Sequence, residues 1–144
     1  MKKSVVLAFL FVFVLGVSSA FALSDEEYRA LVASSPEFKE ADQNLGRVWK
    51  EFYAGLSEKD KKYYKTGQQQ WVKKWRDDDA KKLMKNLGVS KAEAYTQVTR
   101  RRVNTLRILQ HNSKLSQEEI LAGQSWPDHY FEDWYQEQLK QNNK

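Results

Sequence analysis

Three consecutive aspartates, Asp77 to Asp79, come closer to a catalytic pattern than any other residues of this chain. Glycosidases use two carboxyl groups, one as an acid and the other as a base or a nucleophile. A run of acidic residues is also typical of a solvated helix face or of an ion pair. No second catalytic pattern accompanies the aspartates, so we rank hydrolysis last and predict that the protein is not an enzyme.

Other residue types that commonly do chemistry are sparse. Neither of the two histidines, His111 and His129, has a second histidine or a carboxylate at a convincing metal-ligand spacing. The chain has no cysteine, no glycine-rich phosphate loop and no serine nucleophile motif. The sequence therefore predicts neither a metal site nor a cofactor.

Two charged residues fall on helix faces that are otherwise apolar. At about 100° per residue, Asp78 shares a face with Trp71 and Trp75. Arg102 lies at the centre of a second stripe, formed by Tyr95, Val98, Leu106 and Leu109, with Thr99 at its edge. An unpaired charge is costly to bury, so each of the two needs a partner. We predict a largely buried, structural ion pair between Arg102 and one of the three aspartates, preferably Asp78; a functional role for this pair is the alternative.

The aspartates belong to a long predicted helix. Ser57 and Asp60 have the spacing of an N-cap and its third helical residue, and Gly88 is a typical helix end. One face of this helix carries two tryptophans one turn apart, together with Tyr64 and Gln68. Tryptophans at helical spacing belong more often to a core than to a ligand platform, so we predict that this face is buried.

The rest of the chain also follows the helical period. An apolar stripe after Ser35 and Pro36 comprises Phe38, Ala41, Leu45, Trp49, Phe52 and Leu56. Three Ser-x-x-Glu boxes and an aromatic segment indicate further helices, at 24–27, 90–93, 116–119 and 127–140. No segment alternates as a strand does. We predict an all-α fold, a small antiparallel bundle of about four to five helices in one domain, residues 23–144.

The first 22 residues have the pattern of a secretory signal peptide. Two lysines precede an apolar run, 5–17, that is short for a membrane span, and Ala20-Phe21-Ala22 is a small-x-small cleavage motif. An uncleaved membrane anchor is the alternative. We expect a mature chain that begins at Leu23, is periplasmic or secreted, and has no membrane span.

The mature charge argues against a nucleic-acid partner. Two of the 24 basic residues lie in the signal peptide, which leaves 22 basic and 19 acidic residues and a formal charge of +3. This charge is small, and the two signs are interleaved along the chain. Because there is no cysteine, packing alone has to stabilise the exported domain, and 13% aromatic residues supply large apolar groups for that purpose.

Several residues between positions 35 and 110 form an ordered set: Leu45, Trp49, Phe52, Leu56, Gln68, Trp71, the pair Arg76-Asp77, Thr99, Arg102 and Leu106. This set resembles the LprI-like lysozyme-inhibitor family, whose members are small exported helical proteins. The chain departs from the family in three ways. Gly46 follows the motif leucine where asparagine is usual, cysteines are missing, and the interval from Trp71 to Arg76 is one residue longer.

The resemblance implies a periplasmic binding protein that inhibits a lysozyme-type muramidase. C-type lysozymes are strongly basic, so a chain of charge +3 has no long-range attraction for them. A local acidic patch has to compensate, and Asp77 and Asp79 are therefore the predicted partner-binding residues. The alternative is an envelope structural or interaction protein that has no enzyme target.

We predict that export removes residues 1–22 and leaves Leu23 as the first residue. N-terminal sequencing or intact mass of protein from the envelope fraction measures this directly. A full-length species that retains Met1 in the membrane pellet would support the uncleaved anchor instead.

Overall fold

The structure, a computed structural model, describes residues 23–122 and 130–144. All regular elements in these two ranges are helices, which confirms the all-α prediction: α2 (Asp25–Ser34), α3 (Pro36–Ala54), α4 (Glu58–Gln70), the π-helical turn η1 (Trp71–Trp75), α5 (Arg76–Leu87), α6 (Lys91–Asn112), α7 (Gln117–Leu121) and α8 (Tyr130–Asn142). The predicted signal peptide, 1–22, and the first residues of the predicted C-terminal helix, 127–129, lie outside the described residues. None of the described helices combines the length and the apolar character that crossing a membrane requires.

Serine side chains cap the amino ends of α2, α3, α4 and α6. Each hydroxyl accepts a hydrogen bond from the backbone N–H three residues later, and the four residues are Ser24, Ser35, Ser57 and Ser90. Gly88 ends α5 with a φ of 68°, a left-handed conformation that suits a residue without Cβ. Short-range patterns therefore predicted where these helices begin and where α5 ends.

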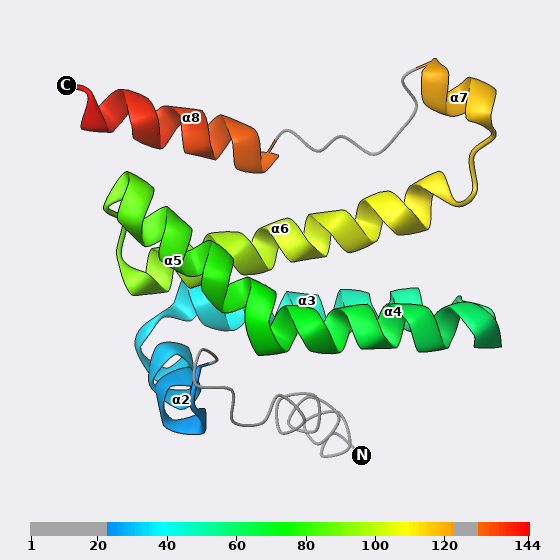
Figure 1. The fold of residues 1–144 in the computed structure, drawn as a ribbon, viewed down its shortest axis with the longest axis horizontal. Coiled ribbons are helices and arrows are strands. Elements are labelled where there is room, and N and C mark those ends of the chain that lie inside the picture. The colour runs from blue at the N-terminus through cyan, green and yellow to red at the C-terminus, as the bar shows by residue number, and fades with distance from the viewer. Residues whose placement is uncertain (1–22, 123–129) are drawn as a thin grey trace.

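The core forms where α3 packs along α6, with α5 against α6 and α2 against α3 (Figure 1). After Gly55 the chain turns back, so α4 runs in the opposite direction to α3 (Figure 1). The rings of Phe52 and Tyr64 meet edge-on across these two helices, 5.1 Å between centroids. Helix α8 contacts both α5 and α6. Helix α6 therefore packs against α3, α5 and α8 and is central to the bundle.

A π turn interrupts the long helix that carries the aspartates. The backbone N–H of Arg76 donates to the carbonyl oxygen of Trp71, five residues earlier, whereas an α-helix makes this bond to the fourth residue. The turn therefore contains one additional residue before the chain returns to the same face. Trp71 and Arg76 are buried, at 7% and 3% exposure, while Trp75 is 53% exposed. The prediction that Trp75 belongs to the core is thus wrong.

The same shift changes which aspartate is buried. Asp77 is fully buried, whereas Asp78 and Asp79 are partly exposed. An uninterrupted α-helix would place Asp78 on the face of Trp71, but the additional residue rotates it away. The buried face continues from Asp77 through Ala80, Leu83 and Leu87.

We predict that deletion of Lys74 is tolerated, because it removes the additional residue and lets η1 become α-helical while Arg76 and Asp77 stay buried. Deletion of Lys82, an exposed residue of α5, should disrupt folding, because it rotates Leu83 and Leu87 out of the core, at a cost of about 2–5 kcal/mol for each leucine. Circular dichroism and urea unfolding of the two deletion variants measure the difference. Equal disruption by both deletions would contradict this interpretation of η1.

Candidate functional site

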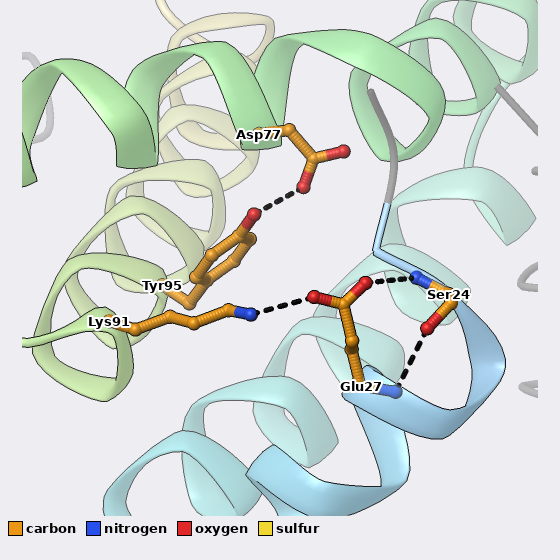
Figure 2. Close-up of polar contacts among 5 residues, drawn as sticks. All are labelled: Ser24, Glu27, Asp77, Lys91 and Tyr95. Atoms are coloured by element: carbon orange, nitrogen blue, oxygen red, sulfur yellow. Dashed lines mark hydrogen bonds and ion pairs between the residues drawn. The ribbon is translucent and has the colours of Figure 1, made fainter. Parts of the chain in front are cut away.

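A cluster of ionisable side chains is buried where α2, α3, α5 and α6 meet. It consists of Tyr28 on α2, Asp42 on α3, Arg76 and Asp77 on α5, and Tyr95 on α6, each less than a tenth exposed. Tyr28 donates a hydrogen bond to Asp42 Oδ2. Tyr95 donates a hydrogen bond of 2.5 Å to Asp77 Oδ1 (Figure 2). The two tyrosine–aspartate pairs therefore join α2 to α3 and α5 to α6.

Burial dominates the pKa values in this cluster. Loss of water raises the pKa of Asp42 and of Asp77, although the tyrosine hydrogen bonds and the Arg76 guanidinium oppose that rise. The pKa values of both tyrosines are raised because their hydroxyls are desolvated and face a carboxylate, so the tyrosines remain neutral donors. Each of these side chains is buried, so we assign the cluster a structural role.

The burial of Asp77 corrects the prediction that it binds a partner. Its side chain is 0% exposed and is bonded to Tyr95, so a partner protein has no access to it. Asp79 is partly exposed and lines the groove described below, so it remains a candidate contact. The predicted acidic patch is therefore reduced to one residue of that pair.

Arg102 is held by neutral groups and not by Asp78. Its Nε donates to Gln68 Oε1 at 2.9 Å, and its guanidinium lies 5.6 Å from the centre of the Trp71 ring. Asp78 takes no part in these contacts, because the π turn rotates it off this face. The predicted ion pair between Arg102 and Asp78 is therefore wrong. Burial lowers the pKa of Arg102, and its charge is retained.

An open groove with a volume of about 990 Å³ lies between the α4–η1 segment and α6. Its walls carry four cationic side chains and two carboxylates: Lys59, Lys62, Arg101, Arg102, Asp60 and Asp79. The remaining lining is polar or aromatic on α4 and η1 and mixed on α6: Tyr63, Tyr64, Thr66, Gly67, Gln70, Trp71, Trp75, Val98, Thr105 and Leu109. The groove is therefore open to solvent, rich in aromatic groups and formally cationic.

We call one edge of this groove the α4–η1 rim; it consists of the exposed lining residues of these two elements, namely Lys59, Asp60, Lys62, Tyr63, Thr66, Gly67, Gln70 and Trp75. Tyr63 is 73% exposed and Trp75 is 53% exposed. Exposed tyrosine and tryptophan side chains next to cations are typical of protein-binding surfaces. The rim is therefore the strongest candidate binding surface in the described residues.

Six residues of the set that resembles the LprI-like family lie where α3, the α4–η1 segment and α6 pack together: Leu45, Trp49, Gln68, Trp71, Thr99 and Leu106. Five of these six residues are buried. The sixth, Trp49, is partly buried and packs against the core. Trp71 is contacted by two guanidiniums, because Arg76 also lies 5.6 Å from its ring centre. Of these six residues only Trp71 lines the groove, and the other five support it from the interior of the bundle.

Sequence reasoning did not identify Asp42 or the two tyrosine–aspartate pairs. A signal was available, because Asp42 lies four residues after Phe38 and three before Leu45, on the apolar stripe of α3. Such a carboxylate on a buried face needs a donor, by the argument that was applied to Arg102. Tyr63 gave no comparable signal, since it lies outside the apolar stripes.

Comparisons with models of protein families, with curated proteins and with solved structures find no match. Within 23–122 and 130–144, no three histidine, cysteine, aspartate or glutamate side chains converge as a metal site would require. A functional conclusion therefore depends on the groove, on its rim and on the sequence resemblance.

We predict that Arg102 is coupled energetically to Gln68 and not to Asp78. In a double-mutant cycle, Arg102→Ala and Gln68→Ala should show a coupling of about 0.5–1.5 kcal/mol, the usual value of one hydrogen bond. Arg102→Ala and Asp78→Ala should be additive. Urea unfolding of the single and double variants measures both quantities, and a coupling confined to Asp78 would restore the ion pair.

Proposed function

We propose that this protein is an exported envelope protein that binds a lysozyme-type muramidase through the α4–η1 rim and inhibits it. The signal-peptide pattern of residues 1–22 supports export, and the resemblance to the LprI-like family supports the muramidase target. The observation that carries the binding surface is the exposure of Tyr63 and Trp75 beside two lysines of the rim.

The aromatic groups of the rim are exposed and yet held in position. The ring of Tyr63 meets that of Tyr64 edge-on, 5.0 Å between centroids, and Tyr64 packs against the buried Phe52. Lys74 Nζ lies 5.7 Å from the centre of the Trp75 ring. Rigid aromatic side chains lose little conformational freedom on binding and supply much of the binding energy at interfaces. Tyr63 and Trp75 are therefore the proposed anchors.

The cations around the groove suit a muramidase cleft. Such a cleft holds two carboxyl groups on either side of the bond that it cleaves. The rim offers Lys59 and Lys62, and the opposite wall offers Arg101, whose guanidinium lies 4.5 Å from the Phe131 ring centre. A helix that inserts one face into a cleft brings the side chains of that face against the residues of the cleft. The proposal therefore assigns the carboxylate contacts to these lysines in place of Asp77 and Asp79.

The overall charges of the two proteins oppose association. A mature chain with 22 basic and 19 acidic residues repels a basic lysozyme at long range. Salt screens this repulsion over a distance of about 8–10 Å. Salt screens the exposed lysine–carboxylate contacts as well, so inhibition of a basic lysozyme should depend only weakly on salt.

The test is a turbidity assay in which a muramidase clears a suspension of bacterial cell walls, with the chain 23–144 added in molar excess. Tyr63→Ala combined with Trp75→Ala should weaken inhibition by about tenfold or more, since interface anchors each contribute more than about 1 kcal/mol. Leu121→Ala is the matched control, because Leu121 is 80% exposed and lies outside the groove.

The possible outcomes separate the alternatives. Inhibition that survives the double substitution would keep the activity and reject the rim. A complete lack of inhibition against every lysozyme class would favour an envelope structural or interaction protein with no enzyme target. Inhibition that weakens steeply with salt would contradict the assigned balance of charges.

A further inference from the structure

With both aspartates ionised, the buried cluster carries one more negative charge than positive charge. Asp42 and Asp77 are two carboxylates, Arg76 is one guanidinium, and the two tyrosines are neutral. Asp77 Oδ1 accepts from Tyr95, whereas Asp77 Oδ2 is buried and makes no hydrogen bond of normal length and angle to the described residues. A buried carboxylate oxygen without a donor is costly. Arg76 Nε is also buried and unpaired, but it makes no hydrogen bond to this oxygen. Asp77 Oδ2 therefore needs a further donor, and a cation would also balance the charge.

The beginning of the described chain lies at this oxygen. Leu23 is 7% exposed and belongs to the core, and the interaction of its backbone N–H with Asp77 lowers the pKa of that carboxyl. Figure 2 shows the second carboxylate oxygen of Asp77 pointing away from Tyr95. The backbone nitrogen of Leu23 is therefore close to the Asp77 carboxylate, whose oxygen without a hydrogen bond is Oδ2.

Hydrogen bonds hold this part of the chain in place (Figure 2). The backbone N–H of Ser24 donates to Glu27 Oε1 at 3.1 Å, and the Ser24 hydroxyl accepts from the Glu27 N–H. Lys91 Nζ donates to Glu27 Oε2 at 2.8 Å, and chiefly for that reason the pKa of Glu27 is held at about 2. Glu27 therefore links the start of α2 to the start of α6, and Ser24, which it also binds, directly follows Leu23.

We infer that removal of the signal peptide completes the cluster, because the new α-ammonium group of Leu23 forms an ion pair with Asp77. The inference rests on the proposed export and on cleavage after Ala22. A signal peptidase adds one water across the peptide bond, so Ala22 leaves as a carboxylate and the Leu23 nitrogen becomes an amine. At neutral pH this amine binds a proton. One neutral N–H donor is thereby replaced by a cation with three donors.

The other charges around Asp77 leave this role open. Arg76 is close enough to lower the pKa of both Asp42 and Asp77, so its single charge is shared between two carboxylates. Lys81 also lowers the pKa of Asp77, but it is exposed and therefore screened by water. On the side of α2 and α6, Glu27 and Lys91 neutralise each other. The ammonium of Leu23 brings the buried charges to balance.

The test compares three forms of the mature chain that differ only at the amino end. The first begins with a free Leu23, the second retains Ala22, and the third carries an acetyl group on Leu23. Retaining one residue moves the ammonium by about 3.8 Å. At pH 7 the free Leu23 form should unfold at a temperature about 4 °C or more above the other two.

The ion pair also predicts a pH dependence. The ordinary pKa of an α-amino group is about 7.7–8.0, and the pair should raise that of Leu23. The added stability is then fully present below the ordinary pKa and is lost as the pH rises through the raised one. Labelling of the amino group as a function of pH measures this pKa in the native protein, without any substitution.

Asp77→Asn should remove the difference between the three forms and return the amino pKa to its ordinary value. Tyr95→Phe is the matched control, because it removes the other partner of Asp77 and should preserve the difference. Equal unfolding temperatures together with an ordinary amino pKa would overturn the ion pair. An exported protein that begins elsewhere than Leu23 would overturn its premise, whereas a lack of muramidase inhibition would bear only on the proposed function.

Discussion

Burial of Arg76 near two buried aspartates is the constraint on which the arrangement of four helices depends. The guanidinium is 3% exposed, so carboxylates have to lie near it, and each buried carboxylate in turn needs a donor. Asp42 on α3 and Asp77 on α5 lie close enough to Arg76 for its charge to lower their pKa values, and each is bonded to a tyrosine. Phe38 is 0% exposed and packs edge-on against both tyrosine rings. The same side chains therefore take part in apolar packing and in the hydrogen bonding of the buried carboxylates, while Asp77 Oδ2 and Arg76 Nε stay unpaired among the described residues.

The helices could be predicted because their signals are local, but one change of register could not. Serine caps and apolar stripes depend on residues three or four apart, and these rules hold for α2, α3, α4 and α6. The π turn adds one residue to a turn of the helix, so the rotation of about 100° per residue does not hold across it. The periodic pattern therefore places Trp75 and Asp78 on the buried face, where the structure has Arg76 and Asp77. The longer interval from Trp71 to Arg76, relative to the LprI-like pattern, was the one available sign of it.

The candidate site was less predictable than the fold, because it depends on which helices lie side by side. Arg102 was correctly identified as a charge that needs a partner, but the choice of a carboxylate overlooked Gln68, an amide on the same predicted face. An amide that accepts from a guanidinium satisfies the donor and leaves its charge uncancelled. The guanidinium of Arg102 therefore leaves a positive charge in the wall of the groove. Tyr63 lies outside every apolar stripe, so only its exposure in the structure identifies it as a candidate.

Both ends of the described chain attach to the turn between α5 and α6. Glu27 reaches Lys91 from α2, and Asn142 Nδ2 donates to the Leu87 carbonyl oxygen at 2.8 Å from α8. These contacts close loops of 64 and 55 residues, and long loops cost more chain entropy than contacts between neighbours. These two contacts can form only once the α5–α6 turn exists, whereas α2 can pack on its neighbour α3 before that. While the chain is synthesised from its amino end, Glu27 on α2 has no ionic partner until Lys91 has been added.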